Sequence, residues 1–171
     1  MIENMSKADL LERKKQVIKD ISKYKNLQLA KKVQLNSAYG AVGNKYFRFF
    51  DVRKAEAITL SGQLSIRWIE RRVNEYLNKI LQTSEADYVI ASDTDSIYVN
   101  FDALVGKCFE EGSDPVKIVN FLDTVASEKL EPFIDKSYEE LAQITNSFDQ
   151  KMFMKREVIA DKAIWTAKKR Y

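Results

Sequence analysis

The spacing of apolar and polar residues divides the first half of the chain into helical segments. Over 7–25, leucine, valine and isoleucine recur at helical spacing with charged residues between them, which predicts a helix. A second helix is expected over 27–39, with Asn26 as the interruption and Gly40 as the C-terminal stop. The longest helix is predicted over 55–81.

Two of the predicted helices carry an apolar stripe that indicates a buried face. In the helix over 55–81 the stripe consists of Ile58, Gly62, Ser65, Ile69, Val73, Tyr76 and Ile80. Because Gly62 and Ser65 are small, another backbone is expected to pass close to them. A later helix should begin at Pro115, with Asp114 as its N-cap, and Pro132 should kink or break it. The buried residues expected in this later helix are Val119, Leu122, Ala126, Leu130, Phe133, Ile134, Tyr138 and Leu141.

Residues 88–101 (YVIASDTDSIYVNF) place a polar centre between two arms of β-branched and aromatic residues, a pattern typical of a β-hairpin. Asp93 and Asp95 lie in this centre. Side chains two residues apart in an extended strand point to the same side, so both carboxylates are expected to face one site. Close carboxylates repel each other unless a cation neutralises them, and such an oxygen site suits Mg²⁺ bound to a phosphate-bearing substrate. The alternative is an ordinary turn, in which Asp and Ser satisfy local hydrogen bonds.

The last part of the chain also has an alternating pattern. Residues 151–159 predict a strand, residues 161–162 a hairpin turn, and residues 163–167 the returning strand. Glu157 on the first of these strands is either a third acid beside the two aspartates or an exposed strand carboxylate.

Two segments lack regular periodicity. Residues 41–54 are expected to form a loop or short strand, and residues 102–114 a surface connection. The order of all these elements predicts an α+β fold, in which helices back an antiparallel sheet that contains the carboxylate hairpin.

The net charge of +3 over 171 residues conceals an uneven distribution. It is +8 over residues 1–54, −10 over 55–150 and +5 over 151–171. Basic ends around an acidic middle suggest that the ends bind a polyanion while the middle supplies carboxylates, although lysine-rich helix faces are also often only solvated.

Composition excludes several classes of protein. The chain contains no histidine, so Cys–His and Ser–His catalysis are excluded. Its single cysteine, Cys108, permits no internal disulfide and favours a reducing compartment. No segment approaches the roughly 20 apolar residues of a membrane-spanning helix, so no membrane association is expected.

The first predicted helix carries a basic stripe. Lys15, Lys19 and Lys23 lie four residues apart and therefore share a face. Such a stripe can bind phosphates, and it can equally be a solvated helix face.

The second predicted helix carries a different polar face. Lys32, Asn36 and Tyr39 have the spacing i, i+4 and i+7, which places a cation, an amide and a phenol ring on one side. A hydrophobic core would not select these three groups together. A nucleotide matches them, with its phosphates at the lysine and its base and sugar at the tyrosine.

Three of these segments resemble the motifs of a known family. Residues 32–40 (KVQLNSAYG) resemble the Kx3NSxYG motif of family B DNA polymerases, residues 92–96 (SDTDS) their DTDS motif, and residues 168–171 (KKRY) their KKxY motif. All three occur in the order that the family has. The stretch between the first two motifs is most similar to replicative polymerases of T-even-like bacteriophages, and the resemblance covers roughly residues 10–171.

The resemblance implies a domain organisation and a catalytic site. Residues 1–43 would be an incomplete fingers portion with two helices, and residues 44–171 an incomplete palm portion with an antiparallel sheet. Asp93 and Asp95 would bind the catalytic metal ions, two Mg²⁺ in the intact site.

The resemblance also implies the residues that bind substrates. Lys32 would contact the incoming triphosphate with Asn36 beside it, and Tyr39 would lie near the nascent base pair. Lys15 and Lys19 have the spacing of the family's basic pair on the first fingers helix, although Arg13 and Lys14 leave the register open. The residues expected to hold the primer-template backbone are Lys168, Lys169, Arg170 and Tyr171.

The implied activity is that of a DNA-directed DNA polymerase, which transfers a nucleotide from a dNTP to a primer 3′-hydroxyl on a DNA template. The family's first carboxylate motif, its exonuclease region and its thumb have no match in the sequence. The chain is therefore expected to be part of a longer protein and inactive alone, with any sliding clamp bound through other regions. A phage-encoded polymerase would act in the host-cell cytoplasm.

Three other interpretations remain. A nucleotide cyclase would share the carboxylate hairpin but would have no use for the basic C-terminal tetrad. A non-catalytic nucleic-acid-binding module would bind DNA with strong salt dependence and show no Mg²⁺-dependent dNTP affinity. A purely structural α+β domain would bind neither DNA nor nucleotides.

Overall fold

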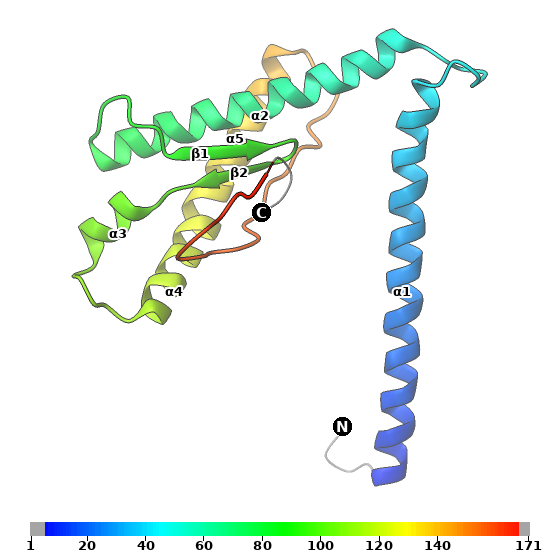
Figure 1. The fold of residues 1–171 in the computed structure, drawn as a ribbon, viewed down its shortest axis with the longest axis horizontal. Helices are drawn as coiled ribbons and strands as arrows, with labels where there is room; N and C mark the ends of the chain where they lie inside the picture. Colours follow the sequence, from blue (N-terminus) through cyan, green and yellow to red (C-terminus); the bar gives the residue numbers. More distant parts are fainter. Residues whose placement is uncertain (1–5, 168–171) are drawn as a thin grey trace. The chain divides into compact units, whose positions relative to one another are not determined.

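The computed structural model describes residues 6–167 as two compact units, Met1–Ile58 and Thr59–Tyr171 (Figure 1). The elements are α1 (Lys7–Val42), α2 (Val52–Leu81), β1 (Val89–Asp93), β2 (Ser96–Val99), α3 (Asp102–Cys108), α4 (Pro115–Val125), the π-helical turn η1 (Ala126–Leu130) and α5 (Glu131–Ile144). The α+β fold class is confirmed. In the described part of the chain none of the helices is long and apolar enough to cross a membrane.

The first unit is built on α1, a continuous helix of 36 residues, so the predicted pair of helices is wrong. Asn26 costs only a few tenths of a kcal/mol in a helix interior, and no proline or glycine stands near it to reinforce a break. Gly40 lies inside the helix. The helix ends instead at Gly43, whose N–H bonds to the carbonyl oxygen of Tyr39, and it begins at Ser6, which forms a capping box with Asp9.

The segment after α1 is a loop of turns and contains no strand, which settles the prediction for residues 41–54 in favour of the loop. Helix α2 begins three residues earlier than predicted because the carboxylate of Asp51 accepts a hydrogen bond from the backbone N–H of Arg53. Burial alone would raise the pKa of the Asp51 carboxyl. The side-chain hydrogen bond and the positive charge of Arg53, and hydrogen bonds from the backbone N–H groups of Arg53 and Lys54, outweigh burial and lower this pKa below its usual value.

The core of the second unit lies between α2, the hairpin and α5 (Figure 1). Of the predicted stripe on α2, Ile69 and Val73 are fully buried, whereas Ile58 and Ile80 are about half exposed. A Cβ atom at Gly62 would meet no described atom within 4 Å, so the expected close backbone is not found. The buried cluster consists of Ile69, Val73, Leu77, Leu81, Tyr88, Val89, Leu130, Ile134, Tyr138 and Leu141.

The later helix predicted to begin at Pro115 is interrupted as expected. Asp114 caps α4 at Val116, and the π-helical turn η1 directly precedes α5, in which Pro132 stands in the first turn. Burial is confirmed for Leu122, Ala126, Leu130, Ile134, Tyr138 and Leu141, while Val119 is exposed. Burial raises the pKa of the Tyr138 hydroxyl.

Two other expectations are wrong. The predicted surface connection over 102–114 contains the short helix α3. The predicted hairpin over 151–167 is not formed: as far as the structure describes this segment, it has an isolated bridge at Ala167 and no strand. Its backbone finds other partners, since the N–H of Arg156 bonds to the carboxylate of Glu131. An alternating pattern without a neighbouring strand edge does not suffice for a strand.

Candidate functional site

The predicted carboxylate hairpin is present, with Asp93 and Asp95 at its tip. Strands β1 and β2 pair antiparallel, and Asp93 opposite Ser96 is the last pair of the ladder. Asp95 lies in the two-residue turn beyond it. Thr94 has a φ of 45°, and the N–H of Asp95 bonds to the carbonyl oxygen of Asp93, so the turn is tight.

The reason for the proximity of the two aspartates differs from the one predicted. Only Asp93 belongs to a strand, so the rule that residues two apart share a side does not extend to Asp95. Asp93 is half-buried and its carboxylate accepts a hydrogen bond from the hydroxyl of Thr94, while Asp95 is exposed. The turn, and not strand alternation, keeps both residues at one end of the hairpin.

The donor set at this tip is small. Nowhere in residues 6–167 do three or more Asp, Glu, His or Cys side chains form a group that could hold a metal ion, so Glu157 does not join the two aspartates as a third acid. Two carboxylates still fit Mg²⁺, which usually keeps several waters and takes one or two protein carboxylates together with substrate phosphates.

A β-bulge precedes the carboxylates. Val89 pairs with Val99, but Ala91 pairs with Tyr98, so Ile90 is the extra residue on β1. A bulge bends its strand and re-aims the side chains that follow. It therefore decides to which face of the hairpin Asp93 belongs.

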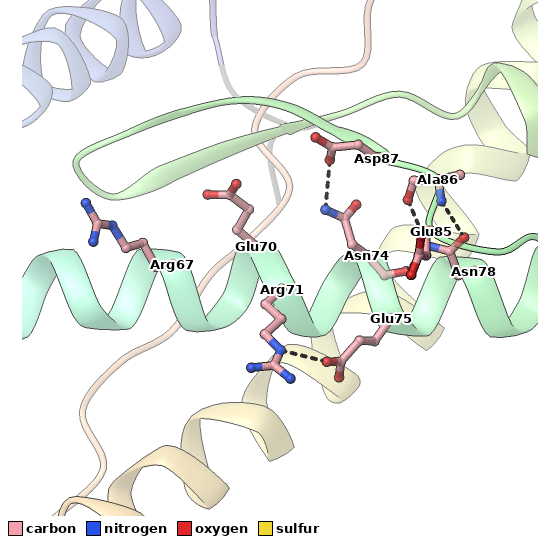
Figure 2. Close-up of a pocket in the computed structure, with 9 residues that line it drawn as sticks. All are labelled: Arg67, Glu70, Arg71, Asn74, Glu75, Asn78, Glu85, Ala86 and Asp87. Atoms are coloured by element: carbon pink, nitrogen blue, oxygen red, sulfur yellow. Dashed lines mark hydrogen bonds and ion pairs between the residues drawn. The ribbon is translucent and has the colours of Figure 1, made fainter.

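A hollow lies elsewhere in the second unit, on α2 and the loop that leads into β1 (Figure 2). It has a volume of about 670 Å³ and is lined by Arg67, Glu70, Arg71, Asn74, Glu75, Asn78, Glu85, Ala86 and Asp87. Neither Asp93 nor Asp95 lines it. Sequence reasoning assigned no role to Asn74 and Asn78, although two asparagines four residues apart inside a helix are a detectable signal, since asparagine favours helix ends.

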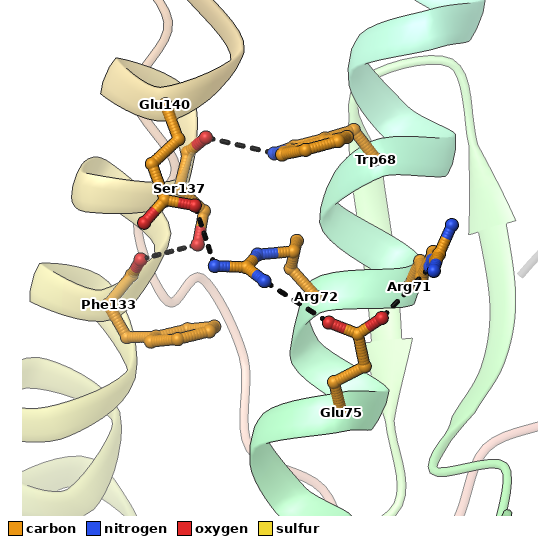
Figure 3. A network of polar contacts seen from close by, with 7 residues as sticks. All are labelled: Trp68, Arg71, Arg72, Glu75, Phe133, Ser137 and Glu140. Atoms are coloured by element: carbon orange, nitrogen blue, oxygen red, sulfur yellow. Dashed lines mark hydrogen bonds and ion pairs between the residues drawn. The ribbon is translucent and has the colours of Figure 1, made fainter.

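A polar network joins α2 to α5 (Figure 3). The guanidinium of Arg72 donates hydrogen bonds to the carboxylates of Glu75, at 3.2 Å, and of Glu140, at 2.6 Å. The indole N–H of Trp68 donates to the carbonyl oxygen of Ser137 at 2.9 Å, and Ser137 is almost fully buried. These bonds fix the helix that supports the hairpin, and sequence reasoning did not find them.

The residues predicted to bind the nucleotide lie on α1. Lys32, Asn36 and Tyr39 are exposed and share one continuous helix, as do Lys15 and Lys19, which are also exposed. They belong to the first unit, and Asp93 and Asp95 to the second. The predicted DNA-binding residues Lys168, Lys169, Arg170 and Tyr171 lie outside the described residues.

The sequence of the chain defines its class. Residues 4–132 match the family described as DNA polymerase family B. The chain therefore belongs to family B of the DNA polymerases.

Two curated relatives agree with this family. The chain is 44% identical over 153 residues to the DNA-directed DNA polymerase of Escherichia phage RB69, and 43% identical over 156 residues to that of Enterobacteria phage T4. Each match covers 84% of this chain and 17% of the relative. The resemblance to polymerases of T-even-like phages is thus confirmed, and the chain spans about a sixth of the length of these relatives.

Proposed function

We propose that this chain is the part of a DNA-directed DNA polymerase that supplies two catalytic carboxylates and part of the nucleotide-binding surface. Membership of family B, together with a tight turn that keeps Asp93 and Asp95 at one end of the hairpin, supports this proposal most directly. The reaction is nucleotidyl transfer from a dNTP to the 3′-hydroxyl of a primer on a DNA template.

In this proposal Asp93 and Asp95 would hold Mg²⁺, and two bound ions would lower the pKa of the primer hydroxyl and neutralise charge on the triphosphate. The exposure of Asp95 suits a ligand that must meet a substrate phosphate. The hydrogen bond from Thr94 to Asp93 limits the rotation of that carboxylate. The chemistry requires no histidine, in agreement with the composition.

The nucleotide would lie against the face of α1 that Lys32, Asn36 and Tyr39 share. A lysine there adds positive charge where the triphosphate and the leaving pyrophosphate carry negative charge. Lys15 and Lys19 are proposed to contact the same triphosphate. The primer-template backbone is assigned to Lys168, Lys169, Arg170 and Tyr171.

The proposed assignment of domains completes the picture. Residues 1–43 would belong to the fingers and residues 44–171 to the palm, and the chain alone would be inactive because the family's first carboxylate motif has no match in it. A sliding clamp would bind through other regions, and a phage-encoded polymerase would work in the host-cell cytoplasm.

Primer extension by a complete polymerase that contains this chain tests the proposal. Asp95→Asn removes a metal ligand without changing size, so turnover should fall by about three orders of magnitude or more, with primer-template affinity within about twofold. The control Asp102→Asn changes an exposed aspartate just beyond the same hairpin and should retain turnover. Normal turnover by the Asp95 variant would contradict the proposal. Salt-dependent DNA binding without any extension by the wild type would favour the binding-module alternative.

A further inference from the structure

Two asparagines of α2 hold the chain where it enters β1 (Figure 2). The side-chain oxygen of Asn74 accepts hydrogen bonds from the backbone N–H groups of Tyr88, at 2.8 Å, and of Val89, at 3.1 Å. Its amide nitrogen donates to the carboxylate of Asp87 at 2.8 Å. Successive N–H groups of a regular strand point to opposite sides, so a single oxygen that binds both fixes a bend at this point.

Asn78, one turn further along α2, holds the preceding loop. Its side-chain oxygen accepts from the N–H of Ala86, at 3.0 Å, and from the hydroxyl of Thr83, at 2.8 Å. Its amide nitrogen donates to the carbonyl oxygens of Ala86, at 2.7 Å, and of Asn74, at 2.9 Å. An asparagine side chain can donate twice and accept twice, so its hydrogen-bonding capacity is fully used.

The loop between α2 and β1 needs such support. Gln82 and Glu85 have φ values of 53° and 56°, a left-handed conformation that non-glycine residues adopt at a cost. Conformations of this kind persist where surrounding contacts determine them. The five bonds to Thr83, Ala86, Tyr88 and Val89 provide these contacts from one helix face.

The same bonds determine where the carboxylates stand. The β ladder begins directly at the residues that Asn74 binds, since the N–H of Asn100 bonds to the carbonyl oxygen of Tyr88 at 2.8 Å. Only the bulge at Ile90 and two further residues separate Val89 from Asp93. An isolated two-stranded hairpin is marginally stable at best, so its anchorage to α2 sets its register and direction.

We propose that Asn74 and Asn78 are positioning residues for the metal-binding tip of the hairpin, acting through the backbone of residues 86–89. This inference rests on the proposed function of Asp93 and Asp95. The two asparagines touch neither metal nor substrate. They fix the bend before the bulge, and the bulge and the turn then bring the two aspartates to the site.

The test uses a complete polymerase that contains this chain, with Mn²⁺ as the titrated cation and primer extension as the readout. Asn74→Ala should lower kcat by about tenfold or more, since small displacements of catalytic groups have large effects on rate. The Mn²⁺ concentration for half-maximal turnover should rise by about threefold or more, while the KM for dNTP stays within about twofold. Asn78→Ala should act in the same direction.

Matched controls separate positioning from general destabilisation. Arg71→Ala alters the same hollow, but Arg71 is hydrogen-bonded to Glu75 of its own helix and not to the loop, so the Mn²⁺ midpoint should not change. Ile134→Val removes one methylene group from the core without removing a hydrogen bond of Asn74 or Asn78, and it should lower thermal stability without moving that midpoint.

A rescue experiment tests the hydrogen bonds themselves. Asn74→Asp places a second carboxylate against Asp87 and should be as defective as Asn74→Ala. The double variant Asn74→Asp, Asp87→Asn exchanges donor and acceptor, leaves both N–H groups of residues 88 and 89 with an acceptor, and should recover the wild-type Mn²⁺ midpoint to within about twofold.

The outcomes distinguish this inference from the function on which it rests. If Asp95→Asn abolishes turnover but Asn74→Ala leaves the Mn²⁺ midpoint unchanged, the positioning role is wrong and the proposed function survives. If Asp95→Asn retains turnover, the proposed function is wrong, and the positioning role that rests on it is wrong as well. A midpoint that moves equally in Ile134→Val would also overturn the positioning role.

Discussion

Helix α1 carries the proposed nucleotide-binding residues and the β1–β2 hairpin carries the proposed metal-binding carboxylates, and the two elements are shaped by different kinds of contact. No residue of α1 is buried, and the side-chain bonds of Gln16 to Asp20 and of Ser37 to the carbonyl oxygen of Val33 join neighbours on the helix itself. The hairpin has short strands but is anchored by Asn74 and by the buried residues Tyr88 and Val89. Local spacing therefore determines the proposed nucleotide-binding face of α1, whereas residues distant in the sequence determine where the hairpin tip with Asp93 and Asp95 stands.

The largest expected difference between the two regions concerns stability. Ile69→Ala removes a side chain with no exposed surface from the core under the hairpin and should lower the free energy of unfolding by about 2–5 kcal/mol. Ile18→Ala on α1 removes a side chain that is about half exposed and should change it by no more than about 0.5 kcal/mol. Urea unfolding followed by far-UV circular dichroism measures both substitutions, and the fluorescence of Trp68 and Trp165 follows the second unit separately. Equal effects of the two substitutions would contradict the comparison.

The second prediction concerns the nucleotide face. In a complete polymerase that contains this chain, Lys32→Ala should lower kcat/KM for dNTP by about 10- to 100-fold, because a charge that faces the triphosphate is lost. Lys31→Ala removes the neighbouring exposed lysine from another side of the helix and serves as the control. Neither variant should alter the unfolding of the second unit. An equal loss of kcat/KM in Lys32→Ala and Lys31→Ala would mean that the total positive charge of the helix matters, and not the face on which the lysine lies.

These differences explain which parts of the structure could be predicted from the sequence. Local patterns were sufficient for the hairpin, for the helix over 55–81 and for the buried face from Leu122 to Leu141, because period and propensity dominate there. They failed at Asn26, where a weak preference did not outweigh helix propagation, and over 151–167, where strand formation depends on a partner.

The candidate site also has some features that local patterns predict and others that depend on residues distant in the sequence. The hairpin that carries the two aspartates and the shared face of Lys32, Asn36 and Tyr39 follow from local sequence patterns, although the turn and not strand alternation brings the aspartates together. The bonds of Asn74 to Tyr88 and of Arg72 to Glu140 join residues 14 and 68 positions apart, and no local pattern reports such pairs. The bulge at Ile90 likewise depends on the partner strand.

The smallest expected effect concerns the start of α2. The pKa of Asp51 is lower in the folded chain than its usual value of 3.8, so its ionised form contributes stability at higher pH. This contribution should be lost as the pH falls below that value. Asp51→Asn keeps a capping side chain without the charge, and the small difference in thermal midpoint between variant and wild type at pH 7 should vanish at pH values well below 3.8. A difference that persists in acid would assign the effect to packing.

The central claim is that Asp93 and Asp95 together hold the divalent cation. Anomalous diffraction from crystals of a complete polymerase containing this chain, soaked in Mn²⁺ with primer-template and dNTP, tests it most directly. The account predicts manganese within coordination distance of both carboxylates, and loss of that signal in Asp95→Asn crystals. Manganese bound elsewhere, or an unchanged signal at the tip in the Asp95→Asn variant, would contradict it.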